Sequence, residues 1–207
     1  KDSSLETLGK IEGIEEDTAK ALIERAKEFY QKDQEDISER IKELGLEDAL
    51  INFKKPLIGA VEGAAVGGGA TILLHFDAVF ISPNTKIKYP FSELCLAPEV
   101  GSSYLLFQAL GYQQAAQLLF QSKIIDGTKY YELGLAKYVG DDFLDQANSY
   151  ARELKEQSLS SIIETKAILK SFMLEELAKA RSMETKAMKK LFGSEDNLKA
   201  VEKFFNK

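Results

Sequence analysis

Cysteine and histidine are almost absent, with one of each among 207 residues. The single cysteine, Cys95, excludes a disulfide within this stretch, which is typical of proteins from reducing compartments. No base or metal-ligand pattern surrounds Cys95, so we interpret it as a core residue. The single histidine, His75, has no serine or cysteine motif beside it, so we expect it to pack or cap rather than act as a catalytic base.

Long apolar runs and basic stripes are also lacking. The longest apolar runs are far below the ~18 residues that a membrane span needs. A net charge of −6 without a dominant basic segment argues against nucleic acid as the main ligand. The acidic cluster at 12–17 lacks the alternation of a calcium loop, so it predicts a solvated helix start and no metal site.

What the sequence does contain is a 44% apolar composition, enough for a substantial core, arranged in three regions. Residues 1–54 are predicted to form a helical arm, because apolar residues recur there at helical spacing. Residues 55–140 have α/β character and are expected to carry the chemistry. Residues 141–207 are predicted to be helical almost throughout. Strands are expected in the second region over 57–61, 77–82 and 86–89.

Three consecutive glycines, Gly67, Gly68 and Gly69, separate a short apolar run from an apolar helical stretch. This order predicts a strand, a tight turn and a helix start. Backbone N–H groups there would be uncovered by side chains, at the end of a helix that favours negative charge. We therefore expect an oxyanion to bind well, although close packing of helix on strand is an alternative reason for the glycines. The spacing fits neither a P-loop nor the dinucleotide fingerprint.

Residues 98–103 read Pro-Glu-Val-Gly-Ser-Ser and directly precede an apolar helical run. Together with the glycine triplet and an Asp-bearing strand at 76–81, this pattern resembles the crotonase (enoyl-CoA hydratase/isomerase) superfamily over about residues 50–205. The resemblance implies a crotonase-like (ClpP/crotonase) α/β fold with its site in the 55–140 core. It also implies a homotrimer or a dimer of trimers, with 141–207 as the helical trimerisation region.

The resemblance assigns the chemistry to Glu99. Crotonase hydratases hold water with two glutamates, and the matching positions here are Thr71 and Phe91, neither of them a carboxylate. Peroxisomal-type Δ3,Δ2-enoyl-CoA isomerases have a single glutamate after the proline of a Pro-Glu-x-Gly motif, which is where Glu99 stands; Val100 departs from a frequent glycine. Glu99 is therefore implied to be the catalytic base, with Gly68 supplying an oxyanion N–H. Without the resemblance, Glu99 would be read as complementing the dipole of the following helix.

The other implied roles concern binding. The substrate would be an acyl-CoA ester, so that coenzyme A is part of the substrate and no separate cofactor is expected. Ser102 and Ser103 read as helix-start residues. The apolar stripe Met173, Leu174, Leu177, Met188 and Leu191 is predicted to face a neighbouring subunit or the chain's own core. The implied substrate-binding residues are Ala64, Val66, Gly67, Phe91 and Leu96, and Lys203 is a weaker candidate for the CoA phosphates.

The family's second oxyanion donor comes from an upstream Ser-x-Gly-x-Asp-like loop, a pattern that residues 1–54 lack. We therefore expect N-terminal strands of the family fold to be missing from these 207 residues, leaving the isolated chain loosely folded or prone to aggregate. A catalytically inactive binding or assembly protein is the alternative to an isomerase of fatty acid β-oxidation. A hydratase is a further alternative, weakened by Thr71 and Phe91. The expected compartment is the peroxisome or, alternatively, the mitochondrial matrix.

Overall fold

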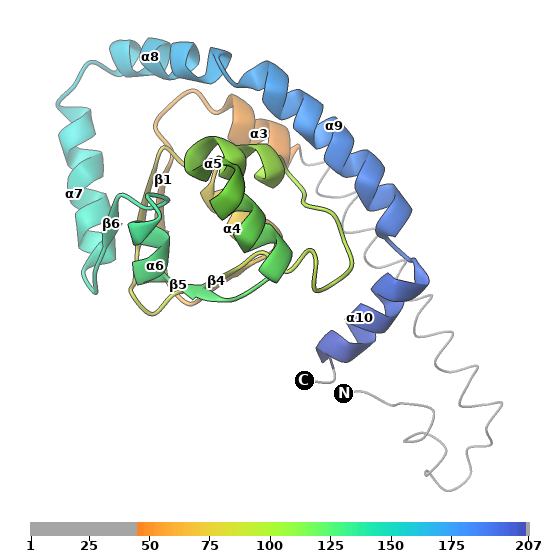
Figure 1. The fold of residues 1–207 in the computed structure, drawn as a ribbon. Helices are drawn as coiled ribbons and strands as arrows, with labels where there is room; N and C mark the ends of the chain where they lie inside the picture. The colour runs from red at the N-terminus through yellow and green to blue at the C-terminus, as the bar shows by residue number, and fades with distance from the viewer. Residues whose placement is uncertain (1–44, 206–207) are drawn as a thin grey trace, which may run out of the picture.

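The computed structural model of the chain describes residues 45–205. Most of the predicted helical arm lies outside the described residues, and only its end is seen, as α3 (Leu46–Asn52) after the left-handed Gly45. A small α/β core follows, and helices wrap around it (Figure 1). Within residues 45–205, no helix has both the length and the apolar character needed to cross a bilayer.

The strands described between residues 45 and 205 form two three-stranded sheets. The first sheet is parallel and contains, in order, β1 (Ile58–Val61), β3 (Ala78–Ile81) and β6 (Tyr138–Val139). The second contains, in order, β2 (Ala64–Val66), β4 (Lys86–Lys88) and β5 (Ile125–Asp126), with β5 antiparallel. The three strands expected from sequence are confirmed as β1, β3 and β4.

Gly63 separates the two sheets. It adopts a φ of 82°, which favours glycine, and turns the chain from β1 into β2. Strands β2, β5 and β6 were not predicted from sequence, because strands of two or three residues depend on their tertiary partners more than on their own residues. In the described part of the chain, β1 pairs only with β3 and so forms one edge of its sheet.

Helices form the rest of the described chain. The core helices are α4 (Gly68–Leu73), α5 (Ser102–Gln121) and α6 (Gly127–Glu132). The C-terminal helices are α7 (Phe143–Lys155), α8 (Leu159–Ser171), α9 (Leu174–Leu191) and α10 (Glu195–Phe205). The predicted helical region 141–207 is interrupted at Phe172 and Met173, where α8 ends and α9 begins. These four helices form an arch around the core (Figure 1).

Two apolar clusters position the parts that matter for function. The main cluster joins both sheets to α4 and α5, and includes Ala70, Ile81, Ile87 and Leu106. A second cluster contains Ile51, Leu105 and Leu177, and it fastens α3 and α9 to α5.

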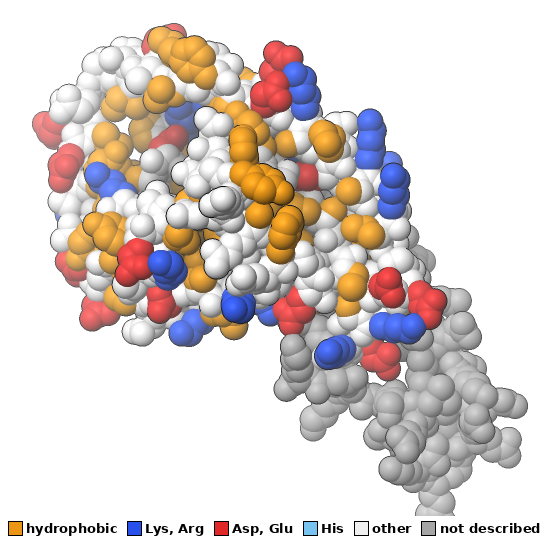
Figure 2. Space-filling view, in the orientation of Figure 1, with side chains coloured by type: hydrophobic (Ala, Val, Ile, Leu, Met, Phe, Trp, Pro, Cys, Tyr) orange, Lys and Arg blue, Asp and Glu red, His pale blue; other side chains and the backbone are white. Residues whose placement is uncertain are grey.

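The apolar stripe of α9 is divided between the core and the surface. Leu177 is 3% exposed, so it belongs to the chain's own core, whereas Leu174 and Leu191 remain exposed. The interpretation of Cys95 as a core residue was wrong: Cys95 is half-buried, in a turn with a φ of 54°. On the face seen in Figure 2, apolar side chains lie exposed across the middle, and charged side chains gather mostly toward the margins.

Candidate active site

Gly68 and Glu99, the two residues implied to carry the chemistry, lie side by side. A Cβ built on Gly68 would stand 3.2 Å from Oε1 of Glu99. Gly68 begins α4, and Glu99 precedes α5, so the two groups come from the starts of different helices. The fold therefore brings a carboxylate against the backbone of the glycine turn.

The glycine turn presents backbone amides. Gly67 has a φ of 58°, and its N–H donates to the carbonyl of Lys88 at 2.9 Å. The Thr71 N–H donates to the Gly67 carbonyl at 3.0 Å. The amides of Gly68 and Gly69 precede that bond, so they have no partner within the helix. A Cβ on Gly69 would meet no atom within 4 Å, which means that the turn is open on that side.

The turn that carries Glu99 has a strained backbone. Val100 and Gly101 have φ values of 54° and 81°. The Ser102 N–H donates to the Glu99 carbonyl at 3.0 Å, just as α5 begins. A Cβ on Gly101 would stand 2.3 Å from Cδ1 of Leu177, so any other residue there would require the buried Leu177 side chain to move. Glu99 thus projects from a turn whose conformation is set by its neighbours.

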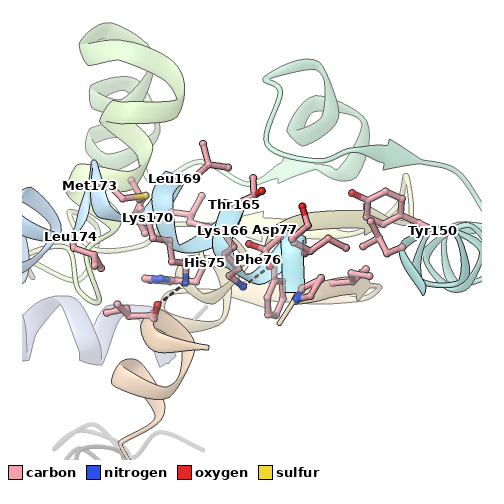
Figure 3. Close-up of a pocket in the computed structure, with 18 of the residues that line it drawn as sticks. His75, Phe76, Asp77, Tyr150, Thr165, Lys166, Leu169, Lys170, Met173 and Leu174 are labelled. Carbon is pink, nitrogen blue, oxygen red and sulfur yellow. Dashed lines mark hydrogen bonds and ion pairs between the residues drawn. The ribbon is translucent and has the colours of Figure 1, made fainter. Parts of the chain in front are cut away.

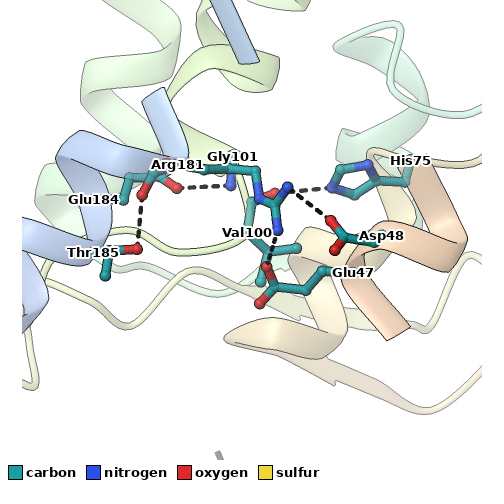
Figure 4. Close-up of polar contacts among 8 residues, drawn as sticks. All are labelled: Glu47, Asp48, His75, Val100, Gly101, Arg181, Glu184 and Thr185. Carbon is teal, nitrogen blue, oxygen red and sulfur yellow. Dashed lines mark hydrogen bonds and ion pairs between the residues drawn. The ribbon is translucent and has the colours of Figure 1, made fainter. Parts of the chain in front are cut away.

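Two side chains from outside the motif hold this turn (Figure 4). Glu184 of α9 accepts hydrogen bonds from the amides of Gly101, at 2.7 Å, and Ser103, at 2.9 Å. His75 Nε2 lies 2.9 Å from the Val100 carbonyl, an acceptor, so this nitrogen carries the proton. His75 is buried and bonded to backbone, in line with the prediction that it packs or caps.

The surroundings make Glu99 a weaker acid. Burial is the chief cause that raises its pKa, and the negative charges of Glu47 and Glu184 raise it further. Burial lowers the pKa of His75, which favours its neutral form. A carboxyl group with a raised pKa is better suited to take up a proton and release it again near neutral pH.

The residues implied to bind substrate differ from one another in how exposed they are. Ala64 and Val66 share the exposed face of β2, which leads through Gly67 into the Gly68 turn. Leu96 is half-buried in the loop before Glu99. Phe91 is 4% exposed and packs in the main core, so its ring does not form an open wall.

The two positions at which hydratases carry glutamates are buried in this chain. Thr71 is 0% exposed, and its hydroxyl donates to the Gly67 carbonyl at 3.3 Å. Phe91 is part of the core. Neither residue presents an acidic group beside Glu99.

Helix α10 is connected to the loop before Glu99 through Asn197, which no sequence pattern singles out. Asn197 is buried, and its Nδ2 donates to the Leu94 carbonyl at 2.6 Å. Lys203 lies further along α10 and is exposed. Its contact with CoA phosphates stays a prediction.

A cavity of about 570 Å³ lies among β1, α7, α8 and α9 (Figure 3). Neither Gly68 nor Glu99 lines it, although His75 does. Lys166, at 8% exposed, contributes an ion pair with Asp77 at 2.6 Å and donates to the Lys55 carbonyl at 2.8 Å. The cavity is therefore not the site that Gly68 and Glu99 form.

Comparison with known proteins gives a consistent family. The chain matches the family model of enoyl-CoA hydratase/isomerase over residues 20–207. Among solved structures it is similar to OdaA of Pseudomonas aeruginosa, with a TM-score of 0.74 and 35% identity, over 78% of this chain and 66% of that one.

Two curated relatives differ in the kind of protein that their names describe. The chain is 38% identical over 92 residues to peroxisomal enoyl-CoA delta isomerase 3 of Mus musculus, covering 44% of this chain and 29% of that protein. It is 29% identical over 182 residues to chromodomain Y-like protein 2 of Mus musculus, covering 87% of this chain and 36% of that protein. The matched part is less than two thirds of the length of each of these proteins and of OdaA.

Proposed function

The chain belongs to the enoyl-CoA hydratase/isomerase family, and we propose that within this family it is a Δ3,Δ2-enoyl-CoA isomerase. Its two small sheets and helical C-terminal region have the crotonase fold that the resemblance implied. The observation that carries the proposal is the carboxylate of Glu99 beside the Gly68 turn, where a Cβ on Gly68 would stand 3.2 Å from its Oε1. One base beside an oxyanion donor suits a proton shift within one substrate.

The proposed reaction moves one proton. Glu99 takes a proton from C2 of a 3-enoyl-CoA, and the electron pair of that C–H bond moves into the thioester, forming a dienolate. The Gly68 N–H donates to the thioester oxygen as charge develops there. The protonated Glu99 then returns the proton to C4, and the double bond ends between C2 and C3, in conjugation with the thioester.

A second oxyanion donor is part of the proposal. Removing one donor from an oxyanion hole typically costs ~2.7–4 kcal/mol of transition-state stabilisation, so a single N–H would leave the dienolate poorly stabilised. We expect the other N–H to come from outside residues 45–205.

Isomerisation is favoured over hydration because hydration needs a second group to orient water. The Thr71 hydroxyl donates to the Gly67 carbonyl, and the Phe91 ring packs in the core, so neither is placed to orient a water. The similarity to the mouse delta isomerase is further support. We expect hydration of 2-enoyl-CoA to be at least ~10²-fold slower than isomerisation in the same preparation, the lower end of what a positioned acid or base contributes. Equal rates would argue for a hydratase.

Replacing the base tests the proposal. We expect Glu99→Gln to lower conversion of 3-enoyl-CoA to 2-enoyl-CoA by ~10²–10⁴, followed by ultraviolet absorbance, because amides do not take up the proton. Binding of the CoA ester should stay within a few-fold. Glu175→Gln removes the same charge from an exposed site on α9 and should leave the rate unchanged. A near wild-type rate for Glu99→Gln would refute Glu99 as the base.

The second candidate is a binding or assembly protein without catalysis. It is favoured by the match to chromodomain Y-like protein 2, whose name is not that of an enzyme and which covers more of this chain than the isomerase match does. Tight binding of acyl-CoA by a wild-type protein that does not isomerise it would support this candidate. A peroxisomal location and a trimeric assembly remain proposals, and the name of the mouse isomerase supports the former.

A further inference from the structure

We propose that Glu184 of α9 is a positioning residue for Glu99, because it holds in place the turn from which Glu99 projects. The kinetic part of this inference rests on the proposed isomerase function. The structural part concerns only contacts within the chain and can be tested without substrate.

The contacts of Glu184 occupy both oxygens of its carboxylate. Oε2 accepts from the Gly101 amide at 2.7 Å, while Oε1 accepts from the amide and the hydroxyl of Ser103, at 2.9 and 2.5 Å. The side chain is 7% exposed. Amides in the first turn of a helix lack intrahelical partners, and a carboxylate there gains both charge-assisted bonds and the favourable helix dipole. Glu184 therefore caps α5 from another helix.

Packing places Glu184 in reach of this turn. Leu177, Arg181 and Glu184 recur at helical spacing and so share one face of α9. A Cβ on Gly101 would stand 2.3 Å from Cδ1 of Leu177 and 3.7 Å from Cγ of Arg181. Gly101 thus permits the close approach of α9, and the carboxylate of Glu184 then meets the turn.

The same face of α9 also holds α3. Arg181 pairs with Glu47 at 2.7 Å and with Asp48 at 3.1 Å (Figure 4). The negative charges that act on Glu99 thus come from two elements, Glu47 of α3 and Glu184 of α9. Arg181 pairs with Glu47 and Asp48, and His75, which follows α4, bonds to the Val100 carbonyl beside Glu99. Helix α9 therefore contacts α3 through Arg181, and the turn at the start of α5 through Glu184.

Glu184 acts on Glu99 in two ways. Its hydrogen bonds hold the backbone on both sides of Gly101, and this fixes the direction of the Glu99 side chain. Its charge is one of the causes that raise the pKa of Glu99. Removing the charge should therefore lower the pKa of Glu99, and removing the hydrogen bonds should loosen the turn.

Glu184→Gln tests both effects. We expect amide hydrogen exchange at Gly101 and Ser103 to become about tenfold faster or more, since a bond to a charged acceptor is lost. The carboxyl carbon signal of Glu99 should titrate at lower pH than in wild type. In assays, kcat should fall about tenfold or more with KM little changed, and the acidic limb of the pH profile should move to lower pH. The control is Glu175→Gln, which removes a charge from an exposed site on the same helix.

Glu184→Asp separates position from charge. It retains the carboxylate on a shorter side chain, so exchange at the turn should accelerate while the pKa of Glu99 stays raised. If Glu184→Gln does not fold, Glu184→Asp carries the test through exchange alone.

The outcomes separate the two proposals. Unchanged exchange and an unchanged Glu99 titration in the variants would overturn the positioning role, whatever the activity. A wild-type protein without isomerase activity, in which Glu184 variants nevertheless shift exchange and titration, would refute the proposed function and retain the positioning role.

Discussion

Gly68 and Glu99 are so close that a single added carbon on the glycine would stand 3.2 Å from Oε1 of the glutamate. That distance is tighter than ordinary van der Waals contact, so the carboxylate would have to move by a few tenths of an ångström. A base must be positioned closely against the proton it takes, and for this reason the pair is sensitive to small additions of volume.

Gly68→Ala should therefore reduce isomerisation about tenfold or more by displacing the Glu99 carboxylate, with little effect on stability. Gly69→Ala is the matched control, because a Cβ there meets no atom within 4 Å. In a helix, that change should stabilise the fold by about 0.4–1 kcal/mol. Steady-state rates and urea unfolding of both variants provide the measurement, and equal loss of activity in the two variants would contradict the prediction.

Gly101→Ala should destabilise the protein by about 2–5 kcal/mol. About 1–2 kcal/mol comes from a side chain at positive φ, and about 1–3 kcal/mol from overpacking against Leu177. Gly45→Ala is the control, since Gly45 precedes α3 in the same left-handed conformation, with a φ of 59°, and a Cβ there meets nothing within 4 Å. The difference between the two free energies of unfolding isolates the contact with α9. If the two variants lose the same stability, Gly101 is needed for its backbone alone.

The raised pKa of Glu99 predicts how stability depends on pH. Below its ordinary pKa of 4.5, Glu99 is protonated in both the folded and the unfolded chain. As the pH rises from there through the folded-state pKa, the unfolded chain ionises first, so wild-type stability falls. The melting temperature of Glu99→Gln minus that of wild type should thus increase across this window, and the difference should stay constant at higher pH. A difference that shrinks with rising pH would show that the folded environment favours the ionised form.

Lys166 should be a strong stability determinant despite its charge. Lys166→Met would leave Asp77 without its buried partner and the Lys55 carbonyl without its donor. We expect a loss of about 2–3 kcal/mol in urea unfolding, below the range for fully buried pairs because Asp77 is more exposed. Lys199→Met removes an exposed pair with Glu195 within α10 and should change stability by less than about 0.5 kcal/mol. Similar losses in both variants would show that burial of Lys166 adds nothing.

The sequence by itself determined the local parts of this protein. The glycine turn and helix start at Gly67–Gly69 follow from residues that are neighbours in the chain, and so does the placement of Glu99 immediately before α5. Both depend on backbone preferences of glycine and on apolar periodicity, which act over a few residues. The family resemblance added which of these residues carry chemistry.

Only the tertiary structure decided what holds the candidate site together. Glu184 meets Gly101 across 83 residues, and His75 meets Val100 across 25. Local preference cannot specify such pairs, because each depends on how helices pack; for the same reason Leu177 could be read as facing either a neighbouring subunit or the core. The meeting of Gly68 with Glu99 has the same origin: two helix starts, each predictable alone, are brought together by the apolar core between α4 and α5.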